Sequence, residues 1–248
     1  MNKQPVAIIT AAGQGIGAAC ARGLAGRGYR LALMSRSGAS VTLAKELGGI
    51  GMNGSVTETD DLEALVELAL SKFGQVDAVV NNTGKDSQSI EASGPGYDPE
   101  LERSLTEIDD DAWQFGFQLY LMNVIRMARV VTPVFQKSGG GSIVNISTFA
   151  QREPRLMFPV SSTIRGALAG YMKLYADRYA REGIRMNNVL PGFVDNWPLS
   201  DGVRRTIPLD RAVSMQELSS TVAFLLSDEA GSITGQNIMI DGGVNRGL

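Results

Sequence analysis

The sequence predicts a single α/β domain over residues 1–248, with one doubly wound sheet of about seven parallel strands and helices on both faces. Two observations lead to this fold class. Short apolar runs rich in Ile, Val and Leu alternate with longer segments of helical periodicity. A glycine-rich turn also links the first apolar run to the first helical segment. Continuous apolar strands separated by helices indicate a parallel sheet that is covered on both faces.

The predicted strands are the apolar runs, and the predicted helices are the periodic segments between them. In chain order the strands are "VAIIT" (6–10), "RLALMS" (30–35), a weaker "GIGMNG" (49–54), "VDAVVNN" (76–82), "GSIVNIS" (141–147), "MNNVLP" (186–191) and "NIMIDG" (237–242). The helices include 15–28, 59–74, 110–136, 161–181 and 214–227, and Ser161 or Ser162 can cap the fourth of these. Segments 85–104 and 191–212 have loop composition and follow strands. Both loops are therefore expected to overhang the carboxyl edge of the sheet, where such folds bind ligands.

Composition excludes several classes of function. The net charge is −3 with no basic cluster, so nucleic acid is not an expected partner. No apolar run reaches the roughly 18 residues of a membrane span, and the first ten residues have no signal-peptide core, so we expect a cytoplasmic protein with no membrane partner. The chain has no histidine, which removes Ser-His and Cys-His pairs and histidine metal sites. Its one cysteine, Cys20, is expected in the core.

The turn after the first strand predicts a nucleotide site. Gly13, Gly15 and Gly17 lead into an amphipathic helix, and glycines let the backbone approach a pyrophosphate that rests on the helix N-terminus. This context indicates a Rossmann-type domain. The expected cofactor contacts here are Thr10, Gly13, Gln14, Gly15, Ile16 and Gly17.

The end of the second strand indicates which nicotinamide cofactor is preferred. A site that prefers NAD usually has an acidic residue here for the ribose 2′-hydroxyl. This chain instead has Ser35, Arg36 and Ser37, and the guanidinium suits a 2′-phosphate. NADP(H) is therefore expected over NAD(H), with a solvated surface arginine as the alternative reading.

Over its full length the sequence resembles the short-chain dehydrogenases/reductases. "TAAGQGIG" is similar to that family's Thr-Gly-x-x-x-Gly-x-Gly with Ala11 in place of the first glycine, and "NNTG" (81–84) is similar to its Asn-Asn-Ala-Gly. "GSIVNIST", "GIRMNNVLPGFVDN" and "ITGQNIMIDGG" resemble later signatures. The resemblance implies adenine contacts at Ser55 and Val56, ribose contacts at Asn82, Thr83 and Gly84, and nicotinamide-side contacts at Pro191, Gly192, Val194 and Asn196.

The family's usual catalytic set of Asn, Ser, Tyr and Lys does not carry over by the same resemblance. Tyr120 falls at the Asn position, Thr148 at the Ser position, Ser161 at the Tyr position and Arg165 at the Lys position. A serine hydroxyl is a far weaker acid than a phenol, whereas an arginine can hold ribose hydroxyls or stabilise an oxyanion. Tyr120 either supplies the missing acid or merely fills the volume beside Ser161.

Other residues have weaker claims. Tyr171 and Lys173 lie off the helical face of Arg165, so packing or an interface is expected. Lys85, Asp86 and Trp197 are candidate walls of the substrate pocket. Asp109, Asp110 and Asp111 open a helix, where carboxylates favour the helix dipole, and no metal site is expected there.

Three functions fit these residues. The first is an NADP(H)-dependent short-chain oxidoreductase for a small carbonyl, alcohol or imine substrate with an altered catalytic set. The second is a non-catalytic nucleotide-binding protein on the same fold, a sensor or partner subunit. The third is a cofactor-free lyase similar to the halohydrin dehalogenases, which differ in losing the glycine loop and keeping the tyrosine. The resemblance also implies a homotetramer, since the family commonly pairs the helices 110–136 and 161–181 between subunits.

Overall fold

The computed structural model describes residues 4–83 and 104–247 and contains a single parallel sheet. Its seven strands lie in the order β3-β2-β1-β4-β5-β6-β7, and every pairing is parallel. The strands are β1 (Val6–Ile9), β2 (Arg30–Ser35), β3 (Ile50–Asn53), β4 (Ala78–Asn81), β5 (Gly141–Ile146), β6 (Ile184–Pro191) and β7 (Asn237–Ile240). The predicted doubly wound sheet of seven strands is confirmed.

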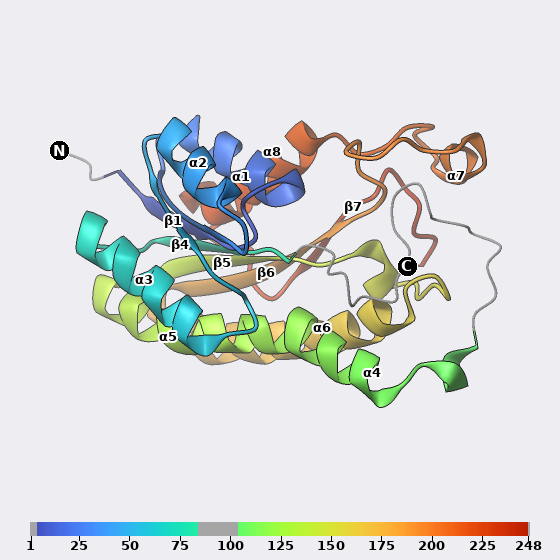
Figure 1. Ribbon diagram of the computed structural model, residues 1–248, viewed down its shortest axis with the longest axis horizontal. Coiled ribbons are helices and arrows are strands. Elements are labelled where there is room, and N and C mark those ends of the chain that lie inside the picture. Colours follow the sequence, from blue (N-terminus) through green and yellow to red (C-terminus); the bar gives the residue numbers. More distant parts are fainter. Residues whose placement is uncertain (1–3, 84–103, 248) are drawn as a thin grey trace.

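Helices cover both faces of the sheet (Figure 1). They are α1 (Gly15–Ala25), α2 (Ala39–Glu46), α3 (Thr59–Phe73), α4 (Asp110–Phe117), α5 (Asn123–Ser138), α6 (Pro159–Tyr179), α7 (Asp201–Thr206) and α8 (Met215–Leu226). Short 3-10 turns occupy η2 (Leu105–Glu107), η4 (Phe149–Gln151), η5 (Ala180–Glu182) and η6 (Asp228–Ala230), and η3 (Gln118–Met122) is a π-helix. Helices α1, α2 and α8 cover one face, and α3, α5 and α6 cover the other.

Alternation along each strand divides the core between the two faces. In β5, Val144 packs in the cluster under α1, α2 and α8, whereas Ile143 packs in the cluster under α3, α5 and α6. Cys20 on α1 is fully buried, and burial raises the pKa of its thiol to about 12. The expectation that Cys20 is a core residue is confirmed.

The start of α6 differs from the sequence prediction, whereas the start of α4 agrees with it. Helix α6 begins at Pro159 after Phe158, and Ser161 and Ser162 are buried inside its first turn, so the expected serine cap was wrong. Proline suits the first position because its missing N–H would have no partner within the helix there. At α4 the side chain of Asp109 accepts a hydrogen bond from the Ala112 N–H at 2.7 Å, as expected for an acidic helix start.

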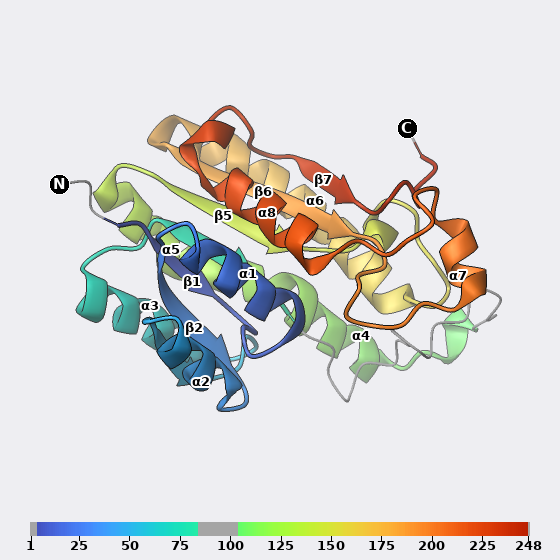
Figure 2. The same cartoon turned by 90° about the horizontal axis from the view of Figure 1, so that it is seen from above.

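The predicted helix 110–136 is divided in the structure. Its middle turn is the π-helix Gln118–Met122, which contains the buried Tyr120. Such turns in a longer helix are frequent at functional sites. Figure 2 shows α4 and α7 beyond the carboxyl ends of β5, β6 and β7, so both border the edge where ligands are expected. Within residues 4–83 and 104–247, no helix combines the length and the apolar character that crossing a membrane requires.

Candidate active site

The glycine turn between β1 and α1 is closed tightly against its neighbours. A Cβ on Gly17 would lie 2.4 Å from the Ala11 carbonyl oxygen, and one on Gly13 would lie 2.9 Å from Ser35 Oγ. Gly15 has a φ of +55°, a conformation that favours glycine. These glycines are required by the turn itself, and they leave the N-terminus of α1 at the carboxyl edge of the sheet.

The ends of β1 and β4 are tied together beside this turn. Thr10 Oγ1 donates to the Asn82 carbonyl at 2.8 Å and accepts from the Asn82 N–H at 3.0 Å. The side-chain amide of Asn82 donates to the carbonyl of Ala11 at 3.2 Å. Asn82 is thereby buried in the floor of the glycine turn, next to the position where the resemblance expects a ribose.

The end of β2 presents an arginine at the surface. Ser35 Oγ donates to the Ser37 carbonyl at 2.7 Å and accepts from the Ser40 N–H at 3.2 Å, which shapes the turn. Arg36 and Ser37 are exposed on that turn, directly beside Gly13 through Ser35. Arg36 therefore follows the residue that packs on Gly13, and its expected contact with a 2′-phosphate stays a prediction.

The segment after β3 is fixed by a hydrogen bond to α3. The Ser55 N–H donates to Asp61 Oδ2 at 2.7 Å, and both Ser55 and Val56 are half-buried after β3. Their expected contact with adenine stays a prediction.

The segment after β6 returns to the glycine turn. Gly192 packs against Asp241, where a Cβ would lie 2.8 Å from Cα, and Val194 forms an isolated bridge with Val213. The side-chain amide of Asn196 lies 4.0 Å from the Cβ position of Gly15. Two loops that are 180 residues apart in sequence therefore meet at one edge, as the resemblance implies.

Asn196 also contacts its neighbour in that segment. In the amide orientation that satisfies both partners, Asn196 donates to the Val194 carbonyl at 3.1 Å and accepts from Trp197 Nε1 at 2.9 Å. The Trp197 side chain is 48% exposed, so its role as a pocket wall stays a prediction. Pro191, at the end of β6, is buried.

Arg165 is the charged centre of the site. It projects from the first half of α6 and is 8% exposed. Its Nη1 donates to the Ile146 carbonyl at 2.6 Å, and its Nη2 donates to Thr83 Oγ1 at 3.1 Å. Its Cζ lies 4.5 Å from the centre of the Tyr120 ring. The guanidinium therefore joins the ends of β4 and β5 to the π-helix, with Ser161 buried one turn earlier on α6.

The contact with Thr83 was missed by the sequence reasoning. The sequence motif "NNTG" differs from the family's Asn-Asn-Ala-Gly at this residue alone, and the threonine supplies the hydroxyl that Arg165 meets. Thr83 and Arg165 both depart from the family's usual residues, but nothing in their sequence spacing indicated that their side chains are in contact.

The end of β5 carries the remaining hydroxyls. Thr148 is half-buried, and its Oγ1 accepts from the Ala150 N–H at 3.3 Å, which caps η4. The hydroxyl of Ser147 donates to Gln151 Oε1 at 2.6 Å. The structure therefore brings Thr83, Tyr120 and Ile146 into contact with Arg165. Thr148 follows two residues after Ile146 in sequence, and Ser161 lies one helical turn from Arg165.

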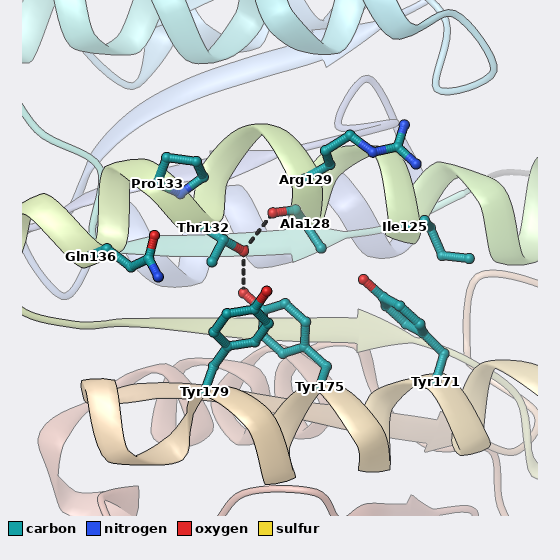
Figure 3. Close-up of a pocket in the computed structure, with 9 residues that line it drawn as sticks. All are labelled: Ile125, Ala128, Arg129, Thr132, Pro133, Gln136, Tyr171, Tyr175 and Tyr179. Carbon is teal, nitrogen blue, oxygen red and sulfur yellow. Dashed lines mark hydrogen bonds between the residues drawn. The ribbon is translucent and has the colours of Figure 1, made fainter.

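Tyr171 and Lys173 lie elsewhere. Figure 3 shows Tyr171, Tyr175 and Tyr179 along one side of a groove of about 320 Å³ between α5 and α6. Tyr175 and Thr132 share a hydrogen bond of 2.6 Å, and burial raises the pKa of Tyr175 to about 12. Lys173 Nζ donates to the Gly235 carbonyl at 3.3 Å. Packing roles fit both Tyr171 and Lys173.

Some expected residues cannot be placed. Gly84, Lys85, Asp86 and most of the loop 85–104 lie outside the described residues. Across residues 4–83 and 104–247, no group of three Cys, Asp or Glu side chains is arranged to hold a metal ion.

Comparison with known proteins agrees with this geometry. A family model described as Enoyl-(Acyl carrier protein) reductase matches residues 10–245. The chain is 30% identical over 250 residues to the 3-oxoacyl-(acyl-carrier-protein) reductase FabG of Salmonella typhimurium, with 96% of each chain covered. It is 30% identical over 263 residues to Dehydrogenase/reductase SDR family member 4 of Caenorhabditis elegans, which covers 98% of this chain and 96% of that relative. The chain belongs to the short-chain dehydrogenase/reductase family.

Other members of the short-chain dehydrogenase/reductase family are also similar. The cis-4-hydroxycyclohexanecarboxylate dehydrogenase of Sinomonas cyclohexanicum is 31% identical over 251 residues, covering 96% of this chain and 95% of that relative. The crystal structure of an actinorhodin polyketide ketoreductase variant with NADPH has a TM-score of 0.86 at 26% identity, and it covers 100% of this chain and 99% of its own. The sheet and its helices are thus those of the short-chain dehydrogenases/reductases.

Proposed function

We propose that this protein is an NADP(H)-dependent oxidoreductase that acts on a small carbonyl or alcohol, or on an imine, with an altered catalytic set. The observation that carries the proposal is the buried Arg165 guanidinium. It bridges Thr83 and Ile146 at the ends of β4 and β5 and lies against the Tyr120 ring. A guanidinium at the ends of these strands can hold ribose hydroxyls or stabilise a developing oxyanion.

The residues present fit a dinucleotide. The glycine turn is packed so closely that side chains at Gly13 and Gly17 are excluded, and the N-terminus of α1 faces the same edge. Arg36 stands at the rim of that turn, where it would hold the 2′-phosphate of NADP(H). The related polyketide ketoreductase, whose crystal structure contains NADPH, supports the choice of cofactor.

When bound, reduced nicotinamide would supply a hydride, and the protein must supply orientation, charge and a proton. The Thr148 hydroxyl would orient a carbonyl, as the corresponding serine does in the family. Arg165 would hold the ribose and stabilise negative charge on oxygen, but an arginine side chain stays charged and does not donate a proton in catalysis. Tyr120 is the one phenol in the set, and its ring lies against the Arg165 guanidinium. We assign the proton to Tyr120 rather than to Ser161.

The experiment is a binding and turnover comparison on the whole protein. NADPH and NADH are titrated separately, and a panel of ketones, aldehydes and imines is then followed by loss of NADPH absorbance. Tight NADPH binding with turnover supports the proposal. Stoichiometric NADPH binding without turnover on the panel would replace it with the non-catalytic reading, and chemistry that needs no nucleotide would replace it with the lyase reading.

We also propose a homotetramer. The groove between α5 and α6 is lined by Tyr171, Tyr175 and Tyr179, and these are the two helices that the family commonly pairs between subunits. Light scattering at micromolar concentration should give about four times the chain mass of 26.5 kDa, and the mass of one chain would refute the proposal.

A further inference from the structure

A row of side-chain amides crosses four strands of the sheet, from the carboxyl ends of β4 and β5 through the middle of β6 to the first residue of β7. Asn81, Asn145, Asn188 and Asn237 occupy directly paired positions in β4, β5, β6 and β7. Asn81 donates its Nδ2–H to Asn145 Oδ1, Asn145 donates to Asn188 Oδ1 in the same way, and Asn188 donates to Asn237 Oδ1, each at 2.9 Å. Together with Gln151, which joins the far end, these residues are called the amide row below.

The amide row ends at Gln151, which contacts the residues that follow β5. Asn237 Oδ1 accepts from Asn188 Nδ2 and also from Gln151 Nε2 at 2.9 Å. The second contact turns Gln151 Oε1 toward Ser147, whose hydroxyl donates to it at 2.6 Å. Gln151 also donates its backbone N–H to the Thr148 carbonyl at 3.1 Å. The row therefore ends on the two residues that follow β5.

The amide row lies on the face of the sheet that α6 covers. Asn145 and Asn188 are two residues from Ile143 and Met186, which pack in the cluster under α3, α5 and α6. That is the face from which Arg165 reaches the Ile146 carbonyl. The end of β5 is thus braced twice, by the Arg165 guanidinium at Ile146 and by the amide row at Ser147.

Strand pairing alone does not require these amides. The backbones of β4 to β7 already pair in register, and apolar side chains of similar shape can be nearly neutral replacements for a buried hydrogen-bonded pair. A buried amide that lacks its hydrogen-bond partner destabilises the folded protein, so each member constrains the orientation of the next. What the row adds to the paired strands is a fixed orientation of the Gln151 side chain toward Ser147.

We propose that Gln151 and Asn237 are positioning residues, which fix the Ser147–Thr148 turn and with it the hydroxyl of Thr148 through the amide row. The role of Thr148 in orienting a carbonyl rests on the proposed function, whereas the fixing of the Ser147–Thr148 turn by Gln151 and Asn237 does not. Neither Gln151 nor Asn237 belongs to the cofactor or catalytic residues named above.

The test compares two substitutions at one residue. Asn237→Ala removes the acceptor for Asn188 and Gln151, whereas Asn237→Asp keeps an oxygen that can accept from both. Ser142→Ala is the matched control, because Ser142 is buried at the other end of β5 and donates to the Leu225 carbonyl at 3.2 Å. For each variant, kcat and KM for a reducible ketone, the NADPH dissociation constant, and hydrogen exchange in residues 147–152 are measured.

The positioning role predicts a specific pattern. Asn237→Ala should lower kcat by about 10- to 100-fold, the size of effect that a misplaced catalytic group produces, with the NADPH dissociation constant changed less than about threefold. Exchange of the Ala150 and Gln151 amide hydrogens should accelerate at least about tenfold in the same variant. Asn237→Asp should restore both values to within about threefold of wild type, and Ser142→Ala should change neither.

Other outcomes overturn the inference. If Asn237→Ala keeps both its kcat and its slow exchange, or if Ser142→Ala shows the same losses, then the amide row is only part of the packing. A wild-type protein that reduces nothing defeats the proposed function instead. In that case the exchange comparison alone decides whether the row holds the turn.

Discussion

The guanidinium of Arg165 lies over the ring of Tyr120, with 4.5 Å between Cζ and the ring centre. Both side chains are buried, at 8% and 7% exposure. By the family resemblance these two residues stand where a lysine and an asparagine are usual. A cation against an aromatic face is stabilised by the ring, and more so when water is excluded. Arg165 and Tyr120 therefore pack as a unit.

Replacing Arg165 by alanine should weaken NADPH binding. The variant loses donors that the proposed function gives to the ribose, so binding should fall by about 1–3 kcal/mol, or roughly 5- to 150-fold in the dissociation constant. Fluorescence titration with NADPH measures the change, and Arg165→Lys, which keeps a cation, should retain most of the affinity. Equal affinity in Arg165→Ala and wild type would remove Arg165 from the cofactor site.

Thr83 and Arg165 should be energetically coupled. Thr83→Ala removes the hydroxyl that accepts from Nη2 at 3.1 Å, and hydrogen bonds to charged groups contribute about 1.5–3 kcal/mol. In a double-mutant cycle on the free energy of unfolding, Thr83→Ala with Arg165→Ala should give a coupling of at least about 1 kcal/mol. Effects that add to within about 0.3 kcal/mol would mean that the contact has no energetic weight.

Ala11 should be a strained residue. It has a φ of +47°, in the left-handed region, at the position where the family motif has glycine. Ala11→Gly relieves about 1–2 kcal/mol of steric cost but adds about 0.4–1 kcal/mol of unfolded-state entropy. The net gain of about 0.5–1 kcal/mol should raise Tm by about 1–4 °C in a calorimetric scan. Ala12→Gly, at a buried residue outside that region, should lower Tm, and a lower Tm in Ala11→Gly would contradict the strain.

Arg36 should set the cofactor preference. It is exposed at the end of β2 beside the glycine turn, where a charge-assisted contact to a 2′-phosphate would contribute about 1.5–3 kcal/mol, or roughly 10- to 150-fold. Arg36→Asp should abolish or reverse the preference for NADPH over NADH. The two dissociation constants, measured for wild type and variant, provide the check. Wild-type protein that binds both cofactors equally would end this assignment.

The fold could be predicted from the sequence because its signals are local. Each buried strand is a continuous apolar run, so strand β3 was found even from the weak "GIGMNG". The long helices have their own periodicity, whereas the short α2 was not predicted and α7 lies within the expected loop 191–212. The helix caps were less predictable. Proline at position 159 began α6 two residues before the serines that looked like caps, and the π-helix at 118–122 has no composition signal.

The site was predictable only in part, for a different reason. The glycine turn follows from one contiguous motif, whereas the contacts of Arg165 join residues from positions 83, 120, 146 and 165. The amide row likewise joins four strands and a turn through side chains that are 43 to 86 residues apart in sequence. Such contacts depend on strand register, which one sequence does not reveal.

The most direct test of the altered catalytic set is the turnover of Tyr120→Phe. This substitution keeps the ring against Arg165 and removes only the hydroxyl, so NADPH binding should be unchanged. With a ketone that the wild type reduces, kcat at saturating NADPH should fall by about 100-fold or more, the size of a general-acid contribution, while Ser161→Ala should lose less than about tenfold. A fully active Tyr120→Phe beside an inactive Ser161→Ala would contradict the account and assign the proton to the serine.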